Sequence, residues 1–171
     1  MLGKILQLKG KIKLNMYKKD GMIFGKNFQV MGKCKFDKVA RCLIQIGDNV
    51  TLSSSVQILV HDGSTKSKLG YSKLAKVTIG NDVFIGSRAM ILPGVTIGNN
   101  VIIGAGSVVR QNIPDNCVVM GNPAQIITQT DKYLQKNAER LEKSIVIKKK
   151  IKKEDFQSIR EQFNKSKGYI I

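Results

Sequence analysis

Apolar positions recur every six residues over residues 79–114, a period that matches neither a helix nor a lone strand. The first apolar column consists of Ile79, Ile85, Ile91, Ile97, Ile103 and Val109. The second column stands four positions further on and consists of Val83, Ala89, Val95, Val101, Ser107 and Ile113. A fixed period over six units indicates a repeat architecture in which each unit stacks on its neighbour.

Three of these units make one triangular turn, so that every third unit lies above the first. Successive turns are expected to stack about 4.8 Å apart, as parallel strands do. This stacking places Ile79 over Ile97 and Ile85 over Ile103. The pattern therefore predicts an all-β fold, a left-handed parallel β-helix of hexapeptide repeats, which is an exception to the usual right-handed crossover.

The repeat continues upstream of this region. Ile46 begins an earlier unit. The chain from Ile46 to Ile79 is longer than one turn of three units by two and a half units, and these extra residues predict an inserted loop at about 61–76. Degenerate units place the start of the coil near residue 22. Before it, alternating apolar positions suggest strands around Leu6, Leu8, Ile12 and Leu14. We assign residues 1–127 to this β-helix domain.

Residues 128–171 lose the period of six and are predicted to form a basic helical C-terminal tail. Helical spacing indicates one helix that is capped at Thr130 or Asp131 and reaches Ile145. A second helix is expected over about 154–166, with Gly168 as its stop. The exposed apolar faces of these helices are expected to pack on the open end of the prism or on a neighbouring subunit.

The formal charge of +17 is concentrated at the two ends of the chain. Residues 1–41 hold eleven Lys or Arg against two acids, residues 42–127 hold six against four, and residues 128–171 hold twelve against six. The excess is explained either by a solvated surface or by anionic cofactors, polymers or a phospholipid surface. No nucleic-acid-binding motif is present, and peripheral membrane contact through the basic ends stays open.

The cysteines, the apolar runs and the single histidine indicate the cellular compartment and the type of catalysis. Three cysteines with no framework spacing indicate free thiols, and no apolar run is long enough to span a membrane, so a cytoplasmic protein is expected. A single histidine cannot supply a three-histidine zinc site, so no metal is expected. That histidine, His61, opens the long loop and is predicted to be a general base. Asp62 follows it, and is either an acceptor-binding residue or a solvated turn aspartate.

The segment from Ile46 to Ile127 resembles the hexapeptide-repeat acyltransferases, and most closely their sugar O-acetyltransferase branch of maltose, galactoside, capsule and lipopolysaccharide acetyltransferases. The motifs that carry the resemblance are VTIGNDVFIGSRAMILPGVTIGNNVIIGAGSVV, NIPDN, GNPAQII and, ahead of them, VHDGS. The resemblance implies a homotrimer with acetyl-CoA in a groove between adjacent prisms. It also implies a sugar or glycan acceptor, and His61 as the base.

The resemblance also implies the residues that bind the cofactor. The family's contacts with the pantetheine arm carry over to Ser87 and Ala105, next to Gly104, and Phe84 stands where a tryptophan is common. Arg110 and Gln111 stand where relatives often have Thr-Lys, and Gln125 stands where they have Lys or Arg. The relatives' basic residues meet the CoA phosphates, and we expect Arg110 to compensate for one of them.

Two other functions fit the same repeat. An acyltransferase that uses acyl carrier protein would suit a basic surface, and a non-catalytic scaffold subunit would share the fold without needing a base. A serine acetyltransferase is a weaker alternative, because the long helical N-terminal domain of those enzymes is missing from this sequence. The acceptor itself depends on the loop 61–76 and on the tails, for which no sequence rule applies.

Overall fold

The computed structural model describes residues 14–164 and 167–170. The described chain divides into two compact units, one ending at Thr130 and the other starting at Asp131. We call the parallel-strand part of the first unit the coil and the second the C-terminal unit. The strands expected around Leu6, Leu8 and Ile12 lie outside the described residues.

The coil consists of three sheets whose strands are parallel, except for the last strand of the second sheet. The first sheet contains β1 (Ile23–Phe24), β4 (Ile44–Ile46), β9 (Val77–Ile79) and β12 (Thr96–Ile97). The second sheet contains β2 (Gln29–Val30), β5 (Thr51–Leu52), β10 (Phe84–Ile85), β13 (Ile102–Ile103), β15 (Cys117–Met120) and β16 (Gln125–Gln129). The third sheet contains β3 (Lys35–Phe36), β6 (Gln57–Ile58), β11 (Met90–Ile91) and β14 (Val108–Val109).

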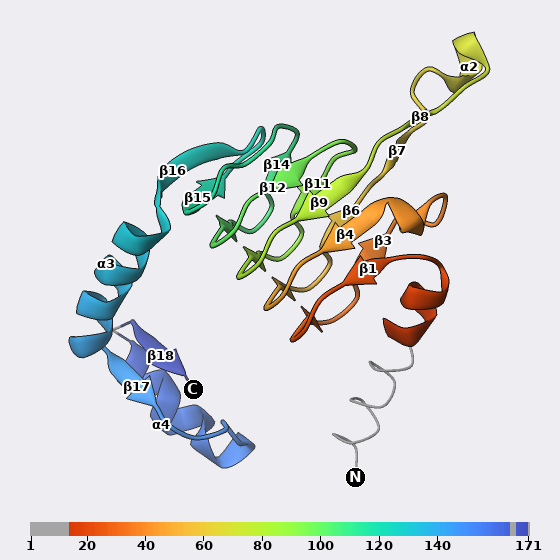
Figure 1. The fold of residues 1–171 in the computed structure, drawn as a ribbon. Helices are drawn as coiled ribbons and strands as arrows, with labels where there is room; N and C mark the ends of the chain where they lie inside the picture. The colour runs from red at the N-terminus through yellow and green to blue at the C-terminus, as the bar shows by residue number, and fades with distance from the viewer. Residues whose placement is uncertain (1–13, 165–166, 171) are drawn as a thin grey trace. The chain divides into compact units, whose positions relative to one another are not determined.

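Consecutive strands of the coil enter the first, second and third sheets in turn, so that the chain winds through rungs that stack on one another (Figure 1). The predicted register is confirmed, because Ile79 pairs with Ile97, Ile85 with Ile103 and Ile91 with Val109. This arrangement of parallel strands fits a left-handed β-helix. It starts at β1, close to the predicted residue 22.

Both apolar columns form the core of the coil. Ile85, Ile91 and Ile103 have no exposed surface, and Ser107 of the second column is also fully buried. The residue before each first-column position faces outward, as alternation along a strand requires, and Phe84 is accordingly 45% exposed. The period of six therefore exists because every rung covers the apolar side chains of the next.

Asparagine and aspartate side chains stabilise the turns between the first and second sheets. The backbone N–H of Asp48 donates to Asn81, that of Asn81 to Asn99, and that of Asn99 to Asp115, with N···O distances of 2.7–2.8 Å. The next residue in three of these turns has a left-handed backbone, with φ of 54–56° at Asn49, Asp82 and Asn100. Short polar side chains tolerate this conformation, and they satisfy N–H groups that the strands leave unpaired.

An antiparallel hairpin interrupts the coil where the inserted loop was predicted. It consists of β7 (His61–Asp62) and β8 (Lys73–Leu74), joined through the short helix α2 (Lys66–Leu69). The hairpin projects away from the stacked rungs (Figure 1). A 3-10 turn, η1 (Arg41–Leu43), precedes β4.

Two predictions at the ends of the chain were wrong. Residues 14–19 are helical, so Leu14 does not lie in a strand. The C-terminal unit is not only helical either, since it contains α3 (Thr130–Glu142), β17 (Ile145–Ile147), η2 (Lys153–Asp155), α4 (Phe156–Phe163) and β18 (Gly168–Ile170). Ile145 therefore lies beyond the first helix. Gly168 begins a strand that pairs in parallel with β17.

Glycine at 168 permits a close approach within this unit. A Cβ at that position would lie 2.4 Å from the carbonyl oxygen of Ile145 and 2.5 Å from the ring of Phe163. The β17–β18 pair therefore packs against α4 only because position 168 has no side chain. None of the helices in the described ranges is long and apolar enough to cross a membrane.

Candidate functional site

His61 lies at the point where the chain leaves the coil and enters the hairpin. It follows Val60, which is fully buried, and it pairs with Leu74 across the base of the hairpin. The N–H of Ala75 donates to the carbonyl oxygen of Val60 at 2.9 Å and closes that base. The backbone of His61 is therefore held by the rigid coil on one side and by a strand pair on the other.

The carboxylate of Asp37 fixes the imidazole ring of His61. Asp37 Oδ2 lies 2.5 Å from His61 Nδ1, and it also accepts the backbone N–H groups of Val60 and His61 at 3.0 and 3.1 Å. The other carboxylate oxygen accepts the N–H of Val39 at 3.0 Å. Rung stacking brings the two residues together, because Phe36, next to Asp37, pairs with Ile58.

Burial and hydrogen bonding act in opposite directions on this carboxylate. The Asp37 side chain is only 3% exposed, which raises its pKa, but the hydrogen bonds from Val39, Val60 and His61 outweigh this effect and lower the pKa below the ordinary value. Asp37 is therefore ionised at neutral pH and accepts the proton on Nδ1 of His61. In the neutral ring, Nε2 is then the proton acceptor.

The ring of His61 is reachable from outside the protein, because 35% of its side chain is exposed. An ordinary structural histidine in a core would have both nitrogens occupied by protein groups. Here an ionised carboxylate holds one nitrogen, and the ring is partly exposed at the mouth of the long insertion. This arrangement can accept a proton from a bound hydroxyl group.

Asp62 makes its contacts within the hairpin. Its carboxylate accepts the N–H of Ser64 at 2.9 Å and lies 3.7 Å from the ammonium group of Lys73. The hydrogen bond from Ser64 and the charge of Lys73 lower the pKa of this carboxyl group. These contacts match the turn aspartate that the sequence left as one alternative. The acceptor-binding role of Asp62 stays a prediction.

Three of the predicted cofactor residues gather at the turn from the second to the third sheet. Ser87 and Ala105 occupy this turn on adjacent rungs, and the N–H of Gly106 donates to the carbonyl oxygen of Ser87 at 2.8 Å. The Ser87 hydroxyl lies 2.7 Å from that of Ser53, one rung before it. A Cβ at Gly104, the third of these residues, would lie 2.7 Å from that of Met120, so the turn has no space for a side chain there.

The other predicted cofactor residues lie elsewhere on the coil. Phe84 stands on the outer face of the second sheet, paired with Thr51 and Ile102 on the adjoining rungs. Arg110 and Gln111 follow β14 and are exposed. They leave the third sheet, as His61 does two strands earlier in the same sheet. Within one chain, His61 and the Ser87–Ala105 turn therefore belong to different corners of the coil.

Asp37, the hydrogen-bond partner of His61, is the residue of the candidate site that the sequence did not predict. It lies in a degenerate rung with no glycine beside it, 24 residues before its histidine partner. Only the register between β3 and β6 reveals the pairing. Across residues 14–164 and 167–170, no group of three or more His, Cys, Asp or Glu side chains is arranged to hold a metal ion.

Comparisons with known proteins agree with the repeat. Residues 76–111 match the family model described as bacterial transferase hexapeptide (six repeats). The chain is 43% identical to Protein CapG of Staphylococcus aureus over 116 residues, which is 61% of this chain and 67% of that protein. It is 40% identical to galactoside O-acetyltransferase of Escherichia coli K12, over 50% of this chain and 44% of that protein.

Solved structures give the same result. A maltose O-acetyltransferase from Clostridium difficile 630 is 42% identical, with a TM-score of 0.60, over 64% of this chain and 59% of that one. The chain thus spans two thirds of one curated relative and less than half of the other. The family model covers residues 76–111, which include the predicted cofactor residues from Phe84 to Gln111 but not His61 or Asp37.

Proposed function

The chain belongs to the bacterial hexapeptide-repeat transferase family and is an acyltransferase, and from this membership we propose that it transfers an acetyl group from acetyl-CoA to a hydroxyl of a sugar or glycan precursor. The names of the maltose and galactoside O-acetyltransferases support the acetyl group and this acceptor class. The observation that carries the proposal is the partly exposed imidazole of His61, held by the buried carboxylate of Asp37.

In the proposed reaction, Nε2 of His61 removes the proton from the acceptor hydroxyl as its oxygen attacks the thioester carbonyl carbon. The new C–O bond forms, the C–S bond breaks, and CoA leaves as a thiolate that takes the proton back from the imidazolium. The ionised Asp37 stabilises the imidazolium and keeps the ring oriented throughout. Asp37 is therefore a positioning residue, and His61 is the catalytic one.

The donor is proposed to bind along the turn at Ser87, Gly104 and Ala105, with Phe84 packing on the cofactor and Arg110 and Gln111 near its phosphates. Because His61 leaves a different corner of the coil, one chain does not complete this site by itself. A homotrimer of closed left-handed prisms would bring the corner of one subunit to that of the next. Sedimentation should then give a particle of three times 18.9 kDa, and a monomer at working concentration would contradict the shared site.

The proposal is tested by replacing the base. In His61→Ala, release of CoA thiol with an acceptor present should fall by roughly 10²–10⁴, because a positioned base contributes about that much. The melting temperature should stay close to that of the unaltered protein, since the ring is partly exposed. Maltose and simple galactosides are the first acceptors to screen, because the relatives are named for them.

A matched variant in the same hairpin makes this result specific. Lys68→Ala alters an exposed side chain of α2, so with the acceptor at saturation it should leave turnover unchanged even if it weakens acceptor binding. If both variants lose activity equally, the hairpin rather than the imidazole is responsible. Near-normal turnover in His61→Ala would remove this residue from the mechanism.

A further inference from the structure

A basic pocket lies within the C-terminal unit and includes none of the residues of the proposed active site. It has a volume of about 630 Å³ and lies between one face of α3 and residues 167–169. Four cationic side chains line it, namely Lys136, Arg140, Lys143 and Lys167. Small-molecule sites in proteins typically have volumes of roughly 300–1,000 Å³, so the pocket is large enough for a ligand.

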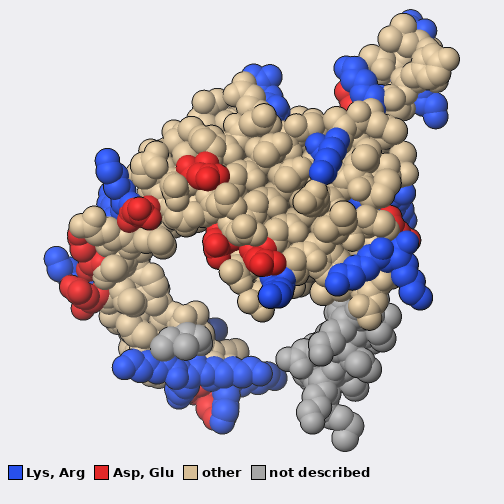
Figure 2. Space-filling view, viewed as in Figure 1, with Lys and Arg blue, Asp and Glu red and all other residues tan. Residues whose placement is uncertain are grey.

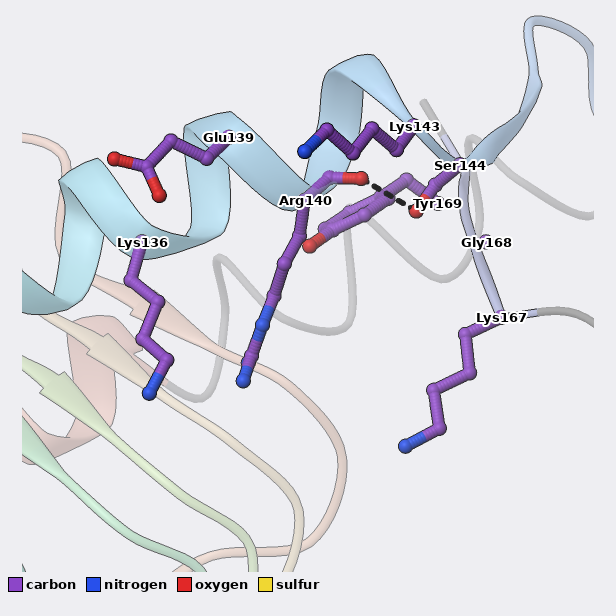
Figure 3. A pocket seen from close by; sticks show the side chains of 8 residues that line it. All are labelled: Lys136, Glu139, Arg140, Lys143, Ser144, Lys167, Gly168 and Tyr169. Atoms are coloured by element: carbon purple, nitrogen blue, oxygen red, sulfur yellow. Dashed lines mark hydrogen bonds between the residues drawn. The ribbon is translucent and has the colours of Figure 1, made fainter.

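The geometry of the pocket directs positive charge to one place. Lys136 and Arg140 are one helical turn apart on α3, and Lys167 enters from the other wall. All three side chains extend to the same side, whereas the carboxylate of Glu139 points away (Figure 3). The ring of Tyr169 lies beside them, and its hydroxyl donates to the carbonyl oxygen of Asn137 at 3.4 Å, which ties β18 to α3.

These cations are not neutralised by acidic side chains. In the ranges 14–164 and 167–170, none of the ion pairs includes Lys136, Arg140, Lys143 or Lys167. Lys136 and Arg140 repel each other one turn apart, and Glu139, which stands three residues after Lys136, offsets only part of this repulsion. An anion in the pocket would reverse the sign of that interaction.

We propose that the basic pocket binds a ligand that carries two linked phosphate groups. The guanidinium of Arg140 matches a phosphate in a bidentate way, and the lysines on both walls supply point charges for a second phosphate. The cations line a concave space beside an aromatic ring, which favours a soluble phosphorylated ligand over a flat lipid surface. The proposal does not rest on acetyl transfer, because it uses none of the residues assigned to that reaction.

Calorimetry on the full-length protein with inorganic pyrophosphate tests the proposal. We expect saturable binding that weakens as salt increases, since the contacts are charge-assisted. Arg140→Gln and Lys136→Gln should each weaken binding by roughly tenfold or more, because hydrogen bonds to charged groups are strong. Arg160→Gln is the matched control, as it removes an arginine from the same unit outside the pocket. It should change the affinity less than twofold.

Two further experiments distinguish binding in the pocket from binding at other phosphate sites. With saturating CoA present, pyrophosphate should still bind with the same stoichiometry, and displacement by CoA would assign the binding to the donor site and overturn the proposal. Vesicles with and without anionic lipid provide the second experiment. Vesicle binding without pyrophosphate binding would show a surface patch and would also overturn it.

Other results are equally decisive. No saturable binding of pyrophosphate, or equal losses in Arg140→Gln and Arg160→Gln, would refute the proposal. Should Arg140→Gln unfold, as judged by circular dichroism, Arg140→Lys keeps the charge and removes only the planar fork. This variant should still weaken pyrophosphate, because the bidentate contact is lost, and an unchanged affinity would contradict the contact assigned to Arg140.

Discussion

The coil and the C-terminal unit both arrange apolar residues periodically, but they bury them to very different extents. Ile85 and Ile91 of the coil are completely covered, whereas Leu134 of α3 is 52% exposed and Phe156 of α4 is 47% exposed. In residues 131–164 and 167–170, no side chain is fully buried. Each rung of the coil is covered by the rung above and below, while two helices and a two-stranded pair are too few to enclose a core.

Charge divides the chain differently, because residues 1–41 and residues 128–171 are both strongly basic while residues 42–127 are nearly neutral. The visible face of the coil is mostly uncharged, and lysines and arginines gather along the C-terminal unit (Figure 2). A region with little core can keep many cations, because their side chains stay hydrated. The coil thus holds its residues rigidly enough for chemistry, and the C-terminal unit offers a charged surface for binding.

Removing core volume should affect the two regions most differently. Ile85→Ala should lower the free energy of unfolding by about 2–5 kcal/mol, because the side chain is fully buried and its loss leaves a cavity. Leu134→Ala on α3 should cost less than about 0.5 kcal/mol in the same urea titration at fixed protein concentration. Equal losses would show that α3 is covered in solution, and the contrast between the regions would fail.

A pair of aspartates sharpens the contrast. Asp37→Asn should cost about 1–3 kcal/mol at pH 7, because it disturbs a buried carboxylate with four hydrogen bonds. In the C-terminal unit, the hydrogen bond from Lys149 lowers the pKa of Asp155, which pairs near the surface. Asp155→Asn should therefore cost less than Asp37→Asn, and an equal cost would contradict the assignment of rigidity to the coil alone.

The same aspartate gives a pH dependence with a definite sign. The pKa of Asp37 is below its ordinary value of 3.8 in the folded protein, so the unfolded chain binds the proton more readily. The stabilisation is fully present above this ordinary value and is lost as the pH falls below it. Unfolding titrations between pH 6 and pH 3 should show the gap between the wild type and Asp37→Asn narrowing only below about pH 4. A gap that stays constant to pH 3 would exclude the ionised carboxylate as its source.

The smallest expected effect concerns the phosphates of the donor. Arg110→Ala should weaken CoA by about two- to fivefold and dephospho-CoA less, because an exposed ion pair contributes little. Arg140→Ala in the C-terminal unit should leave both affinities unchanged. Calorimetry with CoA and dephospho-CoA shows which region contacts the phosphates. If Arg140→Ala weakened CoA more than Arg110→Ala did, the phosphates would bind at the C-terminal unit instead.

The sequence predicted the coil well because its period reports burial directly. Ile85 and Ile103 recur three units apart because each must cover the other. Between Ile46 and Ile79 the chain is longer than one turn requires, so the extra residues could only be an insertion. The position of His61 at the start of that insertion followed from counting. In these cases the tertiary contact can be predicted from the local sequence pattern.

The remaining features depend on contacts that no local pattern contains. Asp37 meets His61 through the register of β3 on β6, and its own rung is too degenerate to predict that register. In the C-terminal unit, Ile145 was placed at the end of a helix, although it begins a run of three β-branched residues, Ile145–Ile147, which favour a strand. Its partner, β18, lies beyond α4, and pairing at that separation is decided by packing around Gly168.

The reversal of direction at β16 limits how far the coil can extend. β16 runs antiparallel on β15 and occupies the outer edge of the second sheet, with an irregularity between Val118 and Val119. A bare parallel rung would expose a row of N–H and C=O groups onto which the first rung of another molecule could stack. In the second sheet, β16 covers that row and becomes the edge itself, and its antiparallel direction does not match the register that a further parallel rung would need. Detaching β16 would convert the last rung into a seed for polymerisation.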